Sequence, residues 1–215
     1  MYVPPAFRED DPATLLDMVR QSSVGLLVSA VEGVITANLI PFEAVEREGR
    51  IALLRAHMAR GNGQWRGLDG QEVLVVFQGA NAYVSPQWYQ SKREHGKVVP
   101  TWNYTMVQVR GHARVIEDRQ WLLEQVTRLT GHHERGLGTG AGWKVSDAPE
   151  DFIAAQLNGI VGVEIEVTEV TGKLKVSQNR AEADREGVAK GLTEQGGDDR
   201  REIAGLVASQ PRNPR

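Results

Sequence analysis

The stretch VGLLVSAVEGVITANLIP, residues 24–41, decides the fold class. It holds two short runs rich in β-branched and other apolar residues on either side of the turn-forming pair Glu32-Gly33, a pattern that predicts a β-hairpin. Similar runs predict strands at residues 50–55, 72–78, 98–117 and 160–170, the third of them broken near Gly111. Successive short strands without alternating helices favour a mainly antiparallel β-barrel with peripheral helices, an α+β fold, over a doubly wound sheet.

Helix signals lie between and beyond these strands. Asp11 and Asp118 are capping residues that precede apolar residues at helical spacing, and the second helix is expected to end near Gly131. A short helix is expected at residues 150–155, and a short helix or turn at residues 57–65.

The composition excludes several classes of site. The 215 residues include no cysteine, so disulfides, thiolate metal sites and cysteine nucleophiles are excluded. With 25 basic and 28 acidic side chains the net charge is −3, so the protein as a whole is not drawn to a polyanion. No apolar run approaches the about 20 residues of a membrane span and the N-terminus has no signal-peptide pattern, so we expect a cytoplasmic protein without membrane contact.

Two patterns mimic functional motifs. Residues 136–141 satisfy the glycine fingerprint of dinucleotide sites, but they follow a helix instead of a strand, so we interpret them as a flexible link. The five histidines lack the spacing of a helical zinc pair, and no metal is expected.

The stretch LLRAHMARGN, residues 53–62, carries the first candidate site. It places Arg55, His57, Arg60 and Asn62 where a strand ends and a turn begins. A phosphate dianion needs several N–H donors and at least one guanidinium, and such a junction supplies both. Asn38, on the neighbouring predicted strand, can reach the same place. A solvated basic turn is the alternative interpretation.

Two further clusters are candidates for contacts with a ligand. Residues 80–104 are dense in tyrosine and tryptophan, which suits a platform for a flat ring or a partner subunit, although an ordinary plug at the end of a barrel has the same composition. In residues 173–180 an extended chain would send Lys173, Lys175, Ser177 and Asn179 to one face, and a charged, exposed strand end is the alternative.

Several segments together resemble the PaiB family, whose members are described as FMN-binding negative transcriptional regulators. They are MYVPPAF at 1–7, HMARGN at 57–62, AYVSP at 82–86, VPTWNY at 99–104 and KVSQNR at 175–180. The resemblance implies a split barrel like that of pyridoxamine-phosphate oxidases and a homodimer with two FMN sites, each built from both subunits. We expect this domain over residues 1–180, then a helical appendage at 181–208 and a polar, disordered tail at 209–215.

The resemblance also assigns roles to residues. Thr36, Ala37, Asn38 and Leu39 would run beside the isoalloxazine ring, and Arg55, His57, Arg60 and Asn62 would hold the phosphate. The remaining residues would come from the other subunit or close the pocket, and they are Trp102, Asn103, Tyr104, Lys175, Gln178 and Arg180. A cation there would oppose the negative charge that develops at the flavin N1–C2=O edge on reduction. Gly63 stands where many relatives have proline, which loosens the turn beside the phosphate.

Four functions remain open at this point. The family description favours a transcriptional regulator with FMN as a redox sensor, and contact with DNA rests on that description alone. The alternatives are an FMN-dependent oxidoreductase that uses a nicotinamide donor, a haem-binding protein with His57 as axial ligand, and a barrel that has lost its cofactor and acts through protein contacts.

Overall fold

A computed structural model describes residues 1–138 and 142–210. The chain forms two compact units. The larger unit comprises Asp11–Phe77 and Gln108–Val170, and the smaller unit comprises Met1–Asp10, Gln78–Val107 and Thr171–Arg215. Long strands contribute residues to both units, namely β6 (Glu72–Val84), β7 (Thr101–Ile116) and β8 (Ile160–Lys175).

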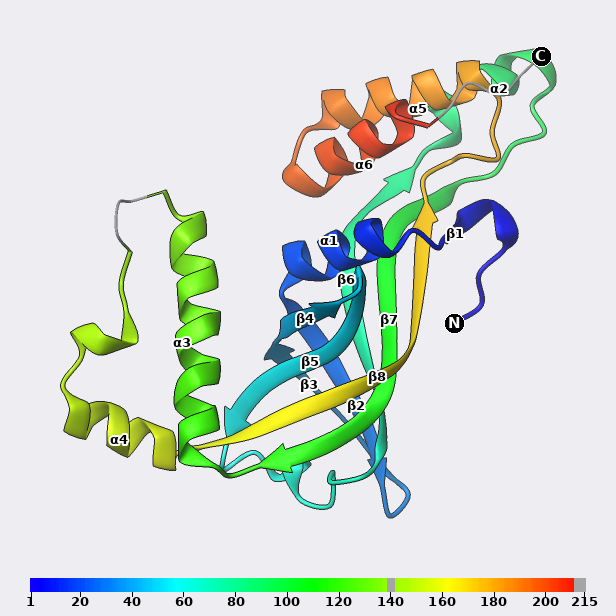
Figure 1. The fold of residues 1–215 in the computed structure, drawn as a ribbon. Coiled ribbons are helices and arrows are strands. Elements are labelled where there is room, and N and C mark those ends of the chain that lie inside the picture. Colours follow the sequence, from blue (N-terminus) through cyan, green and yellow to red (C-terminus); the bar gives the residue numbers. More distant parts are fainter. Residues whose placement is uncertain (139–141, 211–215) are drawn as a thin grey trace. The chain divides into compact units, whose positions relative to one another are not determined.

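The larger unit is built on an antiparallel sheet (Figure 1). Its other strands are β2 (Val24–Val31), β3 (Val34–Pro41), β4 (Glu43–Arg47) and β5 (Arg50–Ala59). The order across the sheet, for the described residues, is β3-β2-β6-β7-β8-β5-β4. The predicted hairpin is confirmed, because β2 and β3 pair antiparallel with Leu27 opposite Asn38. The mainly antiparallel fold is confirmed as well.

Alternating side chains of these strands form the core of the larger unit. Leu27, Leu54, Val75, Val109 and Ile165 are completely buried, as the period of two along a strand requires when one face is covered. Burial of each such side chain stabilises the fold by about 1.5–3 kcal/mol.

The predicted break near Gly111 is wrong. β7 runs through this residue without interruption. A Cβ built on Gly111 would lie 2.2 Å from the backbone oxygen of Glu166 on β8, so the glycine permits a close approach of two strands. A glycine inside a strand pattern signals either a break or such an approach, and here it is the second.

The strand and turn boundaries around β4 and β5 also differ from prediction. Residues 57–59, expected as helix or turn, continue β5, and Ala59 is still paired with Ile160. Only Gly63–Trp65 forms a short 3-10 helix, η2. β4 was not predicted, because its alternating charged residues resemble a solvated turn.

Helices surround the sheet of the larger unit. α1 (Pro12–Ser22) is capped by the Asp11 side chain, which accepts from the Thr14 amide, and α3 (Arg119–Gly136) is capped in the same way by Asp118, so both predicted starts are confirmed. α3 continues past Gly131, its predicted end, because one interior glycine costs only about 1 kcal/mol. The predicted short helix is α4 (Glu150–Asn158), after the 3-10 helix η4 (Val145–Asp147).

The smaller unit holds the remaining elements. A short N-terminal strand, β1 (Arg8–Glu9), pairs antiparallel with the end of β8 and follows the 3-10 helix η1 (Pro5–Phe7). α5 (Glu182–Gln195) and α6 (Asp198–Ala208) lie side by side (Figure 1). The other helices are η3 (Pro86–Trp88) and α2 (Gln90–His95).

A second hydrophobic core joins α5 and α6 to β6. Val84, Tyr89, Val188, Leu192 and Ile203 are almost fully buried in it. α5 and α6 lie within residues 181–208, and the assignment of this segment as a separate helical appendage, with its boundaries, stays a prediction. Residues 139–141 of the glycine-rich link and 211–215 of the polar tail lie outside the described residues. No helix within the described ranges has the length and apolar character needed to cross a membrane.

Candidate functional site

Gln64 connects the predicted turn to the hairpin. Its side chain is buried, and Nε2 donates to the Leu27 oxygen at 3.0 Å and to Ser29 Oγ at 3.1 Å. The Thr36 oxygen lies 3.2 Å from the same nitrogen. Asn38 Nδ2 donates to Gln64 Oε1 at 2.9 Å. Two residues of the predicted ring-binding strand are therefore held against the turn after β5 by one amide.

A shallow depression of about 350 Å³ lies at this junction. Thr36 and Asn62, both predicted site residues, line it, and Asn62 Oδ1 accepts from the Gln64 amide at 3.0 Å. Arg66 also lines it, with its guanidinium carbon 5.1 Å from the centre of the Trp65 ring. Among the described residues no carboxylate lies within ion-pair distance of Arg66. The other lining residues are Ser29, Val31, Val34, Gly63 and Gln64.

Arg55 is engaged by a carboxylate. It lies opposite Glu164 in the β5–β8 register, and its Nε donates to Glu164 Oε2 at 2.6 Å. Arg114 Nη2 donates to the other carboxylate oxygen at 2.6 Å. Burial alone would raise the pKa of Glu164, but the hydrogen bonds and charges of the two arginines outweigh it and lower that pKa. Arg55, Glu164 and Arg114 thus form a compact charge network, in which the Arg55 guanidinium is already paired.

His57 and Arg60 are also engaged within the larger unit. His57 Nδ1 lies 2.7 Å from Oε1 of Gln125, a fully buried residue of α3 whose Nε2 has no hydrogen-bond partner among the described residues. Arg60 Nη1 donates to Glu117 Oε2 at 2.5 Å, and Arg60 Nε donates to the Asn158 oxygen at 3.1 Å. A phosphate held by Arg60 would therefore compete with Glu117.

Lys175 is the best-defined cation of the smaller unit. Its Nζ donates to Thr101 Oγ1 at 2.6 Å and to the Trp102 oxygen at 2.7 Å, and it lies 5.8 Å from the centre of the Tyr104 ring. Burial lowers the pKa of Lys175, and the charge of neighbouring Lys173 acts in the same direction. An ammonium fixed in this way is preorganised to oppose a negative charge.

The other predicted residues of the smaller unit form a second set of contacts. Asn103 is fully buried, and its Nδ2 donates to Ser177 Oγ at 2.9 Å. Gln178 Oε1 accepts from the Val176 amide at 2.8 Å, and its Nε2 donates to the Leu174 oxygen. These bonds fix the turn that follows β8.

Arg180 ends this turn. Its guanidinium carbon lies 4.7 Å from the centre of the buried Tyr89 ring. Burial raises the pKa of the Tyr89 phenol, although the charge of Arg180 opposes that shift. Arg180 therefore stabilises the packing around Tyr89 in addition to any contact with a ligand.

The structure brings the predicted residues together within each unit. Thr36, Asn38 and Asn62 meet through Gln64, whereas Ala37 and Leu39 are exposed on β3. Arg55, His57 and Arg60 lie on or just after β5 with partners of their own. The roles of all these residues as FMN contacts stay predictions. Sequence reasoning missed Gln64, Arg66, Glu117, Gln125 and Glu164, since none of them stands out by type or spacing.

The residues around the depression include the kinds of group that an FMN phosphate requires. A phosphate requires a cation and donors, and Arg66 and Asn62 lie at one depression. The volume of about 350 Å³ lies at the lower end of what small-molecule sites show, about 300–1,000 Å³. Within the smaller unit, taken by itself, Lys175 is a fixed cation of the kind that can oppose the negative charge a flavin gains on reduction.

Comparison with known proteins identifies the family. The family described as "Putative FMN-binding domain" matches residues 1–169. The "Protease synthase and sporulation protein PAI 2" of Bacillus subtilis is 32% identical over 209 residues, which cover 96% of each chain. A protein of Emericella nidulans is 32% identical over 241 aligned residues, which likewise cover 96% of each chain.

Solved structures support the fold. A flavocytochrome of Azotobacter vinelandii superposes with a TM-score of 0.58 at 14% identity, over 78% of this chain and 69% of that one. An FAD and haem binding protein of Mycobacterium smegmatis gives a TM-score of 0.56 at 14% identity, over 78% and 73%. Both similarities show the split-barrel fold of flavin proteins. The chain belongs to the family defined by this FMN-binding domain, the PaiB family, and FMN is the cofactor of that family.

Proposed function

We propose that this protein is a homodimer that holds two FMN molecules and that the oxidation state of the flavin controls a regulatory output. The cofactor follows from the family. The regulatory part is supported by the name of the Bacillus subtilis relative, which describes a role in protease synthesis and sporulation. Because the net charge is −3, we assign the regulatory output to contacts with other proteins in preference to direct binding to DNA.

The observation that carries the proposal is the character of β3. This strand lies at one end of the sheet order, and three of its apolar side chains, Val34, Ile35 and Leu39, are 65–75% exposed. An edge strand with exposed apolar residues invites pairing or packing against another chain. The same strand carries Thr36 and Asn38, which Gln64 ties to the depression. A dimer contact at β3 would therefore border the proposed flavin site.

Two arginines are proposed to compete for the flavin phosphate. Arg66 faces the depression without a carboxylate partner among the described residues, and Arg60 is held by Glu117. If Arg60 binds the phosphate, as the resemblance implies, Glu117 must release it. Binding of FMN would then also loosen the contact between Arg60 and the end of α4, where Arg60 Nε now donates to the Asn158 oxygen.

When bound, the flavin supplies one- or two-electron redox chemistry. The protein's contribution in this proposal is electrostatic. Lys175 is held in place by Thr101 and Trp102 before any ligand arrives, so it opposes the negative charge at the pyrimidine edge without reorganisation. Loss of this cation should lower the reduction potential of the bound flavin.

The first experiment measures FMN affinity by fluorescence quenching for wild type and three variants. Arg60→Ala and Arg66→Ala each remove one candidate phosphate contact, and a charge-assisted hydrogen bond of about 1.5–3 kcal/mol predicts a loss of roughly 10- to 150-fold. Glu117→Ala is the matched control, because it breaks the Arg60 ion pair and leaves the guanidinium. It should retain or improve binding. Wild-type affinity in both arginine variants would reject both assignments.

The second experiment tests the dimer. Small-angle scattering of the FMN-loaded protein should give the mass of two chains, and the double variant Ile35→Lys, Leu39→Lys should give one chain with weakened FMN binding. A monomeric mass for the wild type would contradict the proposal. So would a dimer that survives both lysines with unchanged affinity.

An oxidoreductase remains the second candidate, because the flavin-binding fold and Lys175 suit both roles. Bleaching of the flavin by NADPH or NADH, measured at its visible absorbance band, would favour the enzyme. The haem alternative predicts a Soret band on haem titration that disappears in His57→Ala. It would require His57 Nε2 as ligand while Nδ1 contacts Gln125.

A further inference from the structure

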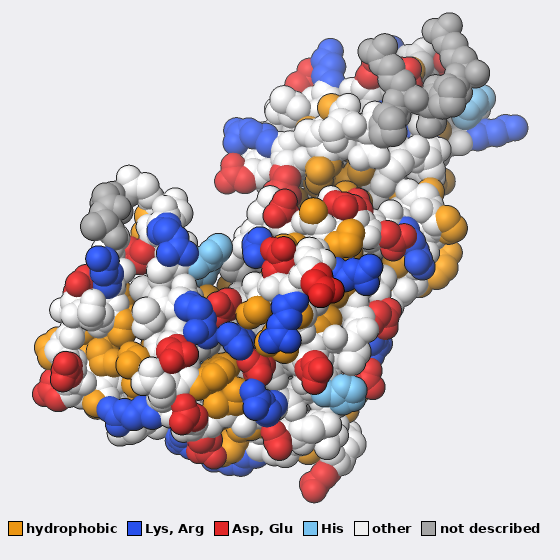
Figure 2. Space-filling model, viewed as in Figure 1, with side chains coloured by type: hydrophobic (Ala, Val, Ile, Leu, Met, Phe, Trp, Pro, Cys, Tyr) orange, Lys and Arg blue, Asp and Glu red, His pale blue; other side chains and the backbone are white. Residues whose placement is uncertain are grey.

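A cleft separate from the proposed flavin site lies beside α3. Its volume is about 630 Å³, and its walls come from the end of α1, the start of β4 and the second half of α3, all within the larger unit. It shares no lining residue with the depression at Gln64 and contains none of the predicted FMN contacts. Figure 2 shows the surface hollowed beside α3, with basic and histidine side chains around the hollow.

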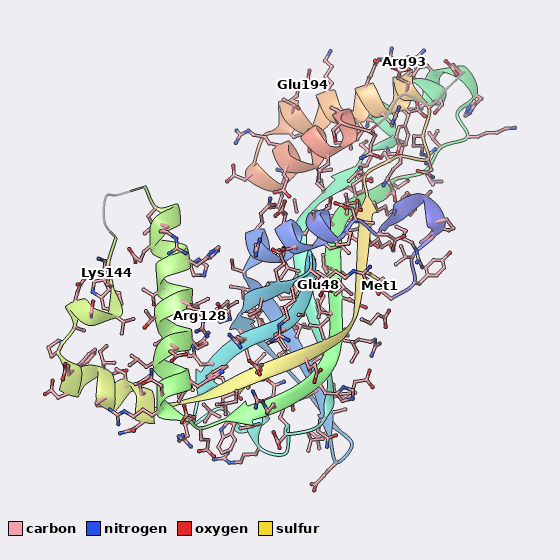
Figure 3. All side chains as sticks on the ribbon, viewed as in Figure 1. Met1, Glu48, Arg93, Arg128, Lys144 and Glu194 are labelled. Atoms are coloured by element: carbon pink, nitrogen blue, oxygen red, sulfur yellow. The ribbon has the colours of Figure 1, made fainter. Side chains whose placement is uncertain are left out.

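Three of the side chains around this cleft are arginines. Arg20, Arg128, Arg135 and His132 line it, against a single carboxylate, Glu43. Arg128 Nε donates to both carboxylate oxygens of Glu43, at 2.9 and 3.1 Å. Figure 3 shows Arg128 on the side of α3 that faces β4 and β5. Arg128 therefore already neutralises Glu43, the one acidic residue that the described part of the chain contributes to the lining.

Two of the cations keep charge available for a ligand. Arg20 contacts Glu46 at 3.5 Å, with both side chains more than 40% exposed, and such a pair contributes little. Arg135 has no carboxylate within ion-pair distance in the part of the chain that the structure describes. The cleft thus carries an excess of positive charge, with the exposed guanidinium groups of Arg20 and Arg135 at its rim.

The floor and one wall of the cleft are rigid. Phe42 and Leu129 are buried and supply an apolar floor. Ser23 ends α1 with φ at 51°, its amide donates to the Val19 oxygen, and its own oxygen accepts from the Phe42 amide at 2.8 Å. A non-glycine residue in this region of φ persists only where the surroundings hold it. The binding surface is therefore preorganised.

We propose that this cleft is a second ligand site, which binds a small organic anion with phosphoryl or carboxylate groups. Guanidinium groups match both groups because they donate two parallel hydrogen bonds. The charged part lies between Arg20 and Arg135, with His132 beside them. The volume exceeds that of a bare phosphate, and the apolar floor of Phe42 and Leu129 receives the organic part.

The test uses the full chain saturated with FMN, so that the flavin site cannot bind the probe. Inorganic pyrophosphate and citrate are titrated separately, which distinguishes phosphoryl from carboxylate recognition. Binding is followed by calorimetry and by amide chemical shifts of Ser23 and Ala44, both in the cleft lining. We expect a dissociation constant below about 1 mM for at least one probe, weakening as salt rises.

The variants decide where the anion binds. Arg20→Ala and Arg135→Ala together should weaken binding by about tenfold or more, while Arg50→Ala, at the turn end of β5, is the matched control and should bind as wild type. Circular dichroism checks folding, and the single variant Arg135→Gln repeats the measurement with one mild change. Three results would overturn the proposal: no binding of either probe, equal binding by the double variant, or binding that FMN abolishes and Arg60→Ala weakens.

Discussion

Replacement of Gln64 by leucine tests how the hairpin and the turn after β5 are held together. Leucine has nearly the same volume and keeps the apolar contacts, but it can neither donate nor accept a hydrogen bond. In the wild type Gln64 is 6% exposed and contacts β2, β3 and the Asn38 side chain. The substitution therefore isolates the polar contribution of one side chain.

The expected loss follows from the partners left behind. The Ser29 hydroxyl is 4% exposed and loses Nε2, and the half-buried Asn38 amide loses Oε1. At about 1–3 kcal/mol for each buried group left unpaired, and less for the half-buried one, the variant should lose about 2–4 kcal/mol. For a chain of this size that corresponds to a fall in Tm of roughly 4–16 °C.

The assay is thermal and urea unfolding of wild type, Gln64→Leu and the control Gln71→Leu, whose side chain is exposed. The control should stay within about 0.5 kcal/mol of wild type. Gln64→Glu tests the sign of the pH dependence of stability. A buried carboxyl that faces the Leu27 and Thr36 oxygens has a raised pKa, so its folded state binds a proton more tightly and its stability should rise as the pH falls toward 6. Equal costs for Gln64→Leu and Gln71→Leu would refute the reasoning.

Three further substitutions give measurable outcomes. Glu164→Gln should lower the free energy of unfolding by about 2–3 kcal/mol at pH 7, less than the loss expected for a fully buried ion pair. The difference from wild type should shrink in acid, because a carboxylate with a lowered pKa stabilises the folded state only above that pKa. Urea midpoints measured from pH 7 to 3 check this. Gly191→Ala should lower Tm despite a helix-propensity gain of about 1 kcal/mol, since the new Cβ would lie 2.5 Å from the Trp88 ring. Asp118→Ala removes the cap of α3 and should cost about 0.5–2 kcal/mol in urea unfolding.

Local signals in the sequence predicted the local structure well. The starts of α1 and α3 were found because a capping aspartate acts on an amide three residues away. The hairpin was found because both strands and the turn lie in one continuous stretch. The errors at Gly111 and Gly131 share one cause, because the role of a glycine depends on what packs against it. At Gly111 that is the distant strand β8, and at Gly131 it is only the Arg135 side chain of the same helix.

The candidate site was predictable only in part. The motif at residues 57–62 drew attention to the end of β5, and one of its residues, Asn62, lines the depression. The partners of its basic residues were not predictable, because Glu164 reaches Arg55 across a strand pairing of 109 residues' separation. Gln125 likewise reaches His57 from a helix 68 residues away. Such pairs are set by the register of the sheet, which no short motif specifies.

These partners determine where the protein can bind an anion. An anion that binds a guanidinium already paired with a carboxylate must displace that carboxylate, and the displacement reduces the net free energy of binding. Arg55, paired with Glu164, and Arg60, paired with Glu117, are therefore poor anion sites until their partners move. Arg66 has no carboxylate partner to release among the described residues. Arg66→Ala should therefore lose more FMN affinity than Arg60→Ala. In a protein that also carries Glu117→Ala, the loss of affinity caused by Arg60→Ala should be larger than in the wild-type background. The reverse order, with Glu117→Ala silent, would show that the flavin phosphate displaces Glu117 readily and that the motif alone decides the site.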